Sequence, residues 1–198
     1  MKQITFKQYR TIDLSILCIL TAIFEAIATS ASDKWFVLQA MTVSITLALT
    51  CITFMRWSLY AVLPSFIGAF VYCTVIGAQL QQYLIYCGGS LFVIIAFPIL
   101  KMITKEKVRK DFFFKMVFAC SVYFSLTLGR WCLSLPFKTS LSTFLTFLGT
   151  DILSLLFAIV VLAISKNIDG LIEDQKAYLL RLEKERLEEQ EANLNDPF

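Results

Sequence analysis

The chain contains no histidine and has only four prolines and seven glycines among its 198 residues. Without histidine it lacks the commonest metal ligand and the commonest general base of enzymes. The six cysteines include no Cys-x-x-Cys pair, and no GxSxG or Walker A pattern occurs. Hydrolase, ATPase and thiol-redox activities therefore each lack an essential part. We expect no enzyme, no metal site and no cofactor.

Charged residues are also scarce, at 17% of the chain, whereas hydrophobic residues make up 58%. The charges gather in short junctions and leave six apolar segments between them. Each segment is about long enough to cross a hydrocarbon core of ~30 Å as a helix. The sequence therefore predicts an all-α integral membrane protein with six transmembrane helices, at residues 11–31, 37–55, 58–78, 83–100, 112–130 and 141–164.

The basic residues indicate how these helices are oriented, because short cytoplasmic loops accumulate Lys and Arg. All but three of the 18 basic residues lie at the amino terminus, at the second-to-third and fourth-to-fifth junctions, or in the tail. The exceptions are Lys34, Arg130 and Lys138. Both termini are therefore expected in the cytoplasm. These loops also account for the net charge of +3, so we expect no nucleic-acid partner.

The composition changes after residue 166. Residues 1–166 form the expected transmembrane domain, and residues 167–198 are typical of a cytoplasmic, charged amphipathic helix with a frayed end. Such a helix lies on the membrane surface, packs on another helix or pairs as a coiled coil, and this one is too short to decide among the three. The basic junction at residues 101–115 has two interpretations: it binds anionic lipid head groups, or it docks a cytoplasmic partner.

Two acidic residues, Glu25 and Asp151, fall inside the predicted hydrocarbon region. An ionisable group there costs at least ~2.5 kcal/mol, so each is a candidate functional residue. Arg130 ends the fifth predicted helix at the outer side. In one interpretation these groups pair with one another or with nearby hydroxyls and hold the bundle together. In the other they line a cavity that is open to the outside and bind a small polar solute, better an amine or a zwitterion than a simple anion.

Two local motifs resemble a known family. The spacing Ala22-Ile-Phe-Glu-Ala26 places small residues four apart, and Pro64-Ser-Phe-Ile-Gly68-Ala69 is rich in helix-bending residues. Together with six helices and a polar outer half, residues 8–166 resemble the substrate-binding S component of energy-coupling factor (ECF) vitamin transporters. The short first outer loop and the long charged tail differ from that family.

The resemblance implies that the chain binds a vitamin-like micronutrient with high affinity and is the substrate-specific subunit of an ATP-driven importer. Its partners would be a membrane coupling protein, contacted through Ala22 and Ala26, and two cytoplasmic ATPases. The location implied is the bacterial plasma membrane. The implied substrate-binding residues are Glu25, Gln39, Gln79, Gln82, Arg130, Trp131 and Asp151.

Two other functions remain open. A self-sufficient, proton-coupled carrier would use Glu25 or Asp151 as its titrating group. A non-transporting scaffold or assembly protein would recruit partners through its carboxy-terminal helix.

Overall fold

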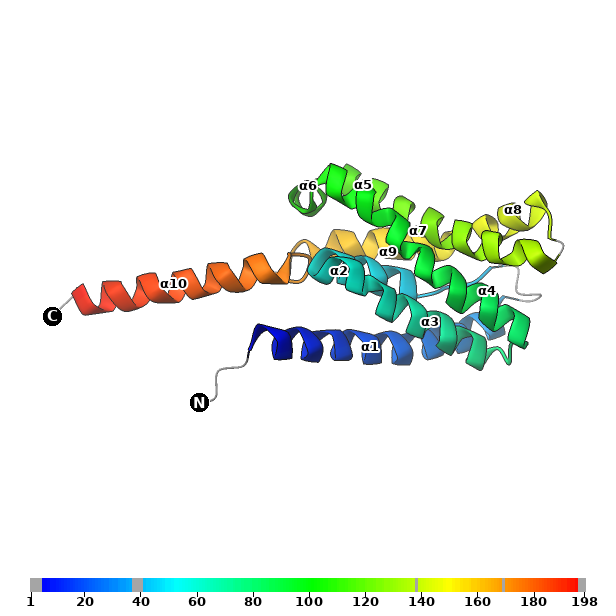
Figure 1. Ribbon diagram of the computed structural model, residues 1–198, viewed down its shortest axis with the longest axis horizontal. Coiled ribbons are helices and arrows are strands. Elements are labelled where there is room, and N and C mark those ends of the chain that lie inside the picture. The colour runs from blue at the N-terminus through cyan, green and yellow to red at the C-terminus, as the bar shows by residue number, and fades with distance from the viewer. Residues whose placement is uncertain (1–4, 37–40, 138, 169, 196–198) are drawn as a thin grey trace.

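The computed structural model describes residues 5–36, 41–137, 139–168 and 170–195. Within these ranges every regular element is a helix, and most of the helices form one elongated bundle from which the last helix projects (Figure 1). The helices are α1 (Phe6–Trp35), α2 (Thr46–Trp57), α3 (Val62–Val75), α4 (Leu80–Ser90), α5 (Ala96–Ile103), α6 (Lys105–Lys110), α7 (Phe112–Ser134), α8 (Leu141–Thr150), α9 (Ile152–Ser165) and α10 (Gln175–Asn195), with 3-10 helices at Ser58–Ala61, Leu91–Ile95 and Leu135–Phe137.

Four helical stretches of the described residues are long and apolar enough to cross a membrane, and a fifth is added if the bent pair α8 and α9 is one span. This confirms an all-helical chain of membrane type. The four are Phe6–Trp35, Thr46–Val75, Leu80–Ile103 and Phe112–Phe137. Helices α8 and α9 meet at an angle of 45°. The sixth predicted helix is therefore bent near its middle.

The stretch Thr46–Val75 folds back on itself. Ser58 adopts a positive φ of 53°, a conformation that interrupts a helix. A Cβ atom added to Gly68 would lie only 1.9 Å from Thr46 Oγ1, whereas one straight helix would place these residues about 33 Å apart. Helices α2 and α3 are therefore the two arms of a hairpin.

Helix α2 occupies the centre of the bundle, and all but two of its 12 residues are buried. At this length it is only about 18 Å long, shorter than a bilayer core. The sequence predicted a helix from residue 37, but residues 41–45 are not helical and α2 begins at Thr46. The non-helical residues 41–45 complete the path of this arm through the bundle.

Helix α1 shows the pattern expected of a helix between protein and lipid. Large apolar side chains are exposed at every third or fourth position along its middle, at Ile12, Ile16, Ile19, Ile23 and Ile27. Its buried stripe includes Thr21, Glu25, Thr29 and Ser32. These four polar side chains therefore face the interior of the bundle, where a polar group finds partners that lipid cannot supply.

The start of α10 is bound to the end of the bundle where α1 begins (Figure 1). Gln175 is buried, and it accepts a hydrogen bond from Tyr9 Oη at 3.0 Å. Arg56 pairs with Asp13 at 2.6 Å and donates to the Gly170 carbonyl at 2.9 Å. The amino-terminal helix, the α2–α3 hairpin and the tail are therefore joined at this end.

Asp174 begins α10 by accepting hydrogen bonds from the backbone of Lys176 and Ala177, and its other oxygen pairs with Lys105 at 2.6 Å. Burial alone raises the pKa of this carboxyl. The hydrogen bond and charge of Lys105, with the two backbone donors, outweigh burial and lower the pKa below its ordinary value. The pair therefore ties α10 to α6 at neutral pH.

The Gly68→Ala variant is expected to lower the free energy of unfolding by about 1–3 kcal/mol, because the added methyl group must displace the Thr46 side chain. Gly149→Ala is a matched control, since an added Cβ meets nothing within 4 Å there. Better helix propensity should leave that variant unchanged or more stable by up to about 1 kcal/mol. Thermal unfolding of both variants in detergent tests the close approach of the hairpin arms, and equal stabilities would contradict it.

Candidate functional site

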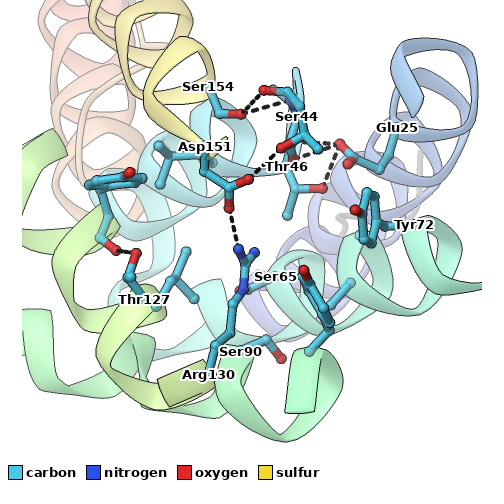
Figure 2. A pocket seen from close by; sticks show the side chains of 17 residues that line it. Glu25, Ser44, Thr46, Ser65, Tyr72, Ser90, Thr127, Arg130, Asp151 and Ser154 are labelled. Atoms are coloured by element: carbon cyan, nitrogen blue, oxygen red, sulfur yellow. Dashed lines mark hydrogen bonds and ion pairs between the residues drawn. The ribbon is translucent and has the colours of Figure 1, made fainter. Parts of the chain in front are cut away.

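A polar cavity lies inside the bundle, between α1, the segment before α2, α3, α4, α7 and the α8–α9 bend (Figure 2). It offers about 40 Å³ to the centres of water molecules. That volume holds about three waters. The three charged side chains that line it are Glu25, Arg130 and Asp151.

Glu25 is only 1% exposed, and its carboxylate binds the start of α2. Its Oε2 atom accepts hydrogen bonds from the backbone N–H of Ile45 at 2.9 Å and of Thr46 at 3.0 Å. The hydroxyls of Ser44 and Thr46 also donate to Oε2, each at 2.9 Å. Helix starts leave N–H groups without intrahelical partners, and an acceptor with negative charge suits them. Glu25 therefore caps α2 from a neighbouring helix.

The non-helical residues before α2 obtain their other hydrogen bonds from the α8–α9 region. The backbone N–H of Thr42 donates to the Thr150 carbonyl at 2.9 Å. The backbone N–H of Ser44 donates to Ser154 Oγ at 2.9 Å, and Ser154 Oγ donates to the Thr42 carbonyl at 3.3 Å. Irregular backbone is tolerated at membrane depth where protein groups supply such partners. The non-helical segment before α2 and the break between α8 and α9 thus support each other.

Asp151 lies at the bend between α8 and α9 and forms an ion pair with Arg130 of α7 (Figure 2). The hydroxyl of Thr42 donates to the other oxygen of Asp151. The two charged side chains are 15% and 16% exposed, so water screens them little. The Arg130 guanidinium also lies 4.7 Å from the centre of the Tyr86 ring. A cation over an aromatic face is favourable, and more so when it is desolvated.

Several polar atoms of the cavity have hydrogen-bonding capacity left. Ser65 Oγ and Arg130 Nε are buried without a partner among the described residues. All four hydrogen bonds to Glu25 reach Oε2, and nothing in the described part of the chain donates to Oε1. Buried polar groups normally have a partner, from protein or from water. A water molecule or the polar atom of a solute would satisfy these.

The structure brings three of the residues proposed from sequence together: Glu25, Arg130 and Asp151 line the same cavity. Glu25 and Asp151 also bind the same short segment, through Thr46 and Thr42 respectively. Of the two interpretations drawn from sequence, pairing within the bundle is present in the structure, and a shared polar cavity is present with it.

The other proposed residues lie elsewhere. Gln79 and Gln82 form a capping box at the exposed start of α4, where the Gln79 backbone N–H donates to Gln82 Oε1 at 3.0 Å. Trp131 packs against Phe144, with ring centres 5.6 Å apart. None of these three lines the cavity. Gln39 lies outside the described residues.

Sequence reasoning missed the hydroxyl groups that complete the site. Thr42, Ser44 and Thr46 alternate along the chain, and this two-residue period inside an apolar segment indicates extended backbone rather than helix. Tyr72 and Tyr86 give no comparable signal. They line the cavity with ring centres 5.1 Å apart because α3 and α4 pack side by side.

The charges of the cavity indicate which solutes it would suit. With both acids ionised, the charged groups of the cavity sum to one negative charge, which favours a solute with N–H donors or a cationic group. No cluster of three or more metal-ligating side chains occurs in the described part of the chain. In comparisons with protein-family models, curated proteins and solved structures, nothing matches this chain. The functional argument therefore depends on the geometry of the cavity.

Proposed function

We propose that the protein binds a small polar solute within the membrane, at the cavity of Glu25, Arg130 and Asp151. The observation that carries the proposal is that a non-helical segment, residues 41–45, and the break between α8 and α9 meet at this cavity, which also receives the charged side chains of Glu25 and Arg130. Membrane transporters form midplane binding sites where helices are broken, because the free ends and unwound backbone bind polar ligands. The break between α8 and α9 supplies such ends here. An amine or zwitterion suits the charges best.

The cavity is too small for a solute of micronutrient size unless the protein changes shape. About 40 Å³ accommodates waters, so a solute of micronutrient size requires the lining helices to separate. Helix α8 is the element best placed to move, because none of its residues is buried. Its last turn is held by a hydrogen bond from Tyr123 Oη to the Leu148 carbonyl, at 2.5 Å. Bending at Asp151 would move α8 and open the cavity beside the ion pair.

Six crossings with both termini in the cytoplasm remain our proposal for the topology. The hairpin of α2 and α3 would supply two crossings, and α8 with α9 one bent crossing. The basic junction joins the tail through the pair of Arg109 and Glu173, at 2.6 Å, and Asp13 of α1 joins the hairpin turn through Arg56. All four regions proposed as cytoplasmic therefore meet at one end of the bundle.

We also propose the role that the sequence resemblance implies: the substrate-specific subunit of an ATP-driven ECF-type importer in the bacterial plasma membrane. Ala22 and Ala26 are half-buried beside the exposed Ile23 and Phe24 on α1. A coupling protein could approach α1 closely at these small residues.

Mild-detergent purification of tagged protein from its native membrane, with mass spectrometry of everything that co-purifies, tests this role. We expect a membrane coupling protein and two ATPases. Recovery of the chain without them would overturn the ECF assignment.

Solute binding is tested separately, by thermal shift of the purified chain with water-soluble vitamins and amines. A shift that disappears in Asp151→Asn would support the binder, and no shift with any solute would contradict it.

A scaffold is the second candidate, because α10 projects away from the bundle (Figure 1). Leu180 and Leu187 on this helix are 58% and 56% exposed. Removing residues 183–198 retains Gln175 and also Arg181, which pairs with Glu173 at 3.2 Å. If the protein is a solute binder, this truncation should leave the thermal shift by solute unchanged. If it is a scaffold, the truncation should abolish partner recovery while Glu25→Gln and Asp151→Asn have no effect.

A self-sufficient carrier is distinguished by a third measurement, uptake into proteoliposomes that contain the chain alone. Proton-coupled uptake that is lost in Glu25→Gln would favour the carrier over the ECF-type subunit. Uptake only after the coupling protein and ATPases are added would favour the importer.

A further inference from the structure

A second cavity lies at the opposite end from α8, between α6 and the junction of α9 with α10. It offers about 310 Å³ to the centres of water molecules, against about 40 Å³ for the cavity around Glu25. Its charged lining residues are Arg109, Lys110, Lys166 and Glu173. Helix α7 begins at Phe112 and α9 ends at Ser165, close in the chain to its lining residues, so the cavity lies at the ends of two apolar helices.

The charges around this cavity are unbalanced. Glu173 is already neutralised, because its Oε1 atom pairs with Arg109 at 2.6 Å and with Arg181 at 3.2 Å. Lys110 and Lys166 are exposed and have no ion-pair partner in the described part of the chain. The cavity therefore presents two cations to whatever occupies it.

A third cation, Lys115, lies close to the lining residue Lys166. Lys115, in the first turn of α7, is only 2% exposed and has no ion-pair partner among the described residues. Its charge repels that of Lys166. A buried cation normally requires a counter-charge, and like charges held together are destabilising unless an anion lies between or beside them. The fold therefore concentrates positive charge here, and no acid in the described part of the chain forms an ion pair with Lys110, Lys115 or Lys166.

One acceptor at the cavity also lacks a donor. Glu173 Oε2 is buried and has no hydrogen-bond partner among the described residues. A phosphate group beside Lys110 and Lys166 would balance the cations, and a hydroxyl or ammonium group attached to it would donate to Glu173. Glycerophospholipid head groups combine a phosphate with such a donor.

We propose that this cavity binds a phosphate-bearing anion, supplied by the head group of a membrane phospholipid, and that Lys110 and Lys166 hold the phosphate. The bound head group joins α6 to the α9–α10 junction and strengthens the attachment of the tail helix. This site is independent of the solute cavity and of the function proposed for it.

Native mass spectrometry of protein released from nanodiscs that contain phosphatidylglycerol, or phosphatidylcholine as a zwitterionic comparison, tests the proposal. Lys110→Gln/Lys166→Gln removes both cavity cations. Lys101→Gln/Lys107→Gln removes the same amount of charge, from residues of the basic junction that do not line the cavity. Each basic residue near an anionic head group contributes about a fivefold preference, so we expect retention of phosphatidylglycerol to fall roughly 20-fold in the cavity variant alone. Thermal unfolding in lipid-free detergent checks that both variants fold.

The outcomes separate the sources of the phosphate. In a parallel arm, inorganic phosphate is added to detergent-solubilised protein. Stabilisation by phosphate that is lost in the cavity variant, with no difference in lipid retention, would keep the anion site and assign it to free phosphate. Equal lipid loss in both double variants would reduce the effect to general surface charge and overturn the proposal. No change in either arm would overturn it as well.

Discussion

Replacing Arg130 with Gln is expected to lower the free energy of unfolding by about 3–5 kcal/mol, because it leaves Asp151 as a buried charge without its partner. The loss includes the contact of the guanidinium with Tyr86. Chemical unfolding in detergent micelles measures the change. Among the single substitutions considered for this chain, this one and the loss of Glu25 should have the largest effects.

A double-mutant cycle isolates the pair. Asp151→Asn alone should also destabilise the protein, whereas Arg130→Gln/Asp151→Asn should be more stable than the sum of the two single losses by at least about 1 kcal/mol. Lys184→Gln is the control for loss of a positive charge, since its pair with Glu188 is highly exposed and should contribute at most about 0.5 kcal/mol. Strictly additive losses would contradict the ion pair.

Arg130→Lys separates the structural and binding roles of this residue. Lysine keeps the positive charge beside Asp151, but it lacks the planar fork of arginine and its stacking on Tyr86. We expect this variant to retain most of the stability that Arg130→Gln loses. Binding of the solute should still be weakened, because the geometry of the donors is lost. Unchanged solute binding in Arg130→Lys would remove the guanidinium from the proposed site.

Replacing Glu25 with Ala is the second substitution expected to have a large effect, with a loss of about 4 kcal/mol or more. The change removes the acceptor of four hydrogen bonds at the start of α2. Each buried donor left without a partner costs about 1–3 kcal/mol, although water entering the cavity satisfies part of the deficit. Low accumulation in the membrane and a lowered Tm in detergent are the measurements.

Glu25→Gln and Thr29→Val provide the comparison. Glutamine retains an acceptor oxygen at the start of α2, so it should lose about 1–2 kcal/mol and remain folded. Thr29 lies one turn further along the same buried face, and its hydroxyl has no partner among the described residues. Replacing it with valine should be neutral or stabilising. If Glu25→Ala were no more destabilised than Thr29→Val, Glu25 would not be the cap of α2.

Glu25 and Asp151 have linked roles because the same short segment, residues 42–46, binds both. Thr46 and Ser44 hold Glu25, and Thr42 holds Asp151. A solute that competes for either acid would loosen the segment before α2 and the bend between α8 and α9 together. Binding at the cavity would in this way be coupled to movement of α8.

Several features of the fold were predictable from the sequence because they depend on local composition. Apolar length predicts helices in a membrane, and the structure confirms an all-helical chain with four to five stretches of spanning character. The rarity of Glu25 and Asp151 in apolar surroundings marked them as candidates, and both line the cavity. The cost of an ionisable group in hydrocarbon makes this signal strong.

Other features were not predictable from composition. The glutamines Gln79 and Gln82 were proposed as ligands, but in the structure they cap α4 and do not line the cavity. Apolar content suggested a helix from residue 37, whereas α2 begins at Thr46. Hydropathy does not distinguish a helix from an extended segment whose backbone is satisfied by a distant carboxylate.

The sequence by itself determined that the chain is helical, where its apolar segments lie and how its basic residues cluster between them. It also singled out the two acids Glu25 and Asp151 as candidate functional residues. Only the tertiary structure decided that Glu25 caps α2, that Arg130 pairs with Asp151 and that the non-helical segment before α2 meets the α8–α9 break at one cavity. The physical reason is the range of the interactions. Whether a segment is apolar enough to lie in lipid depends on residues that are adjacent in the chain. The partner of a buried polar group, however, comes from whichever segment packs beside it. Thr42 and Asp151, for example, are hydrogen-bonded although they lie 109 positions apart.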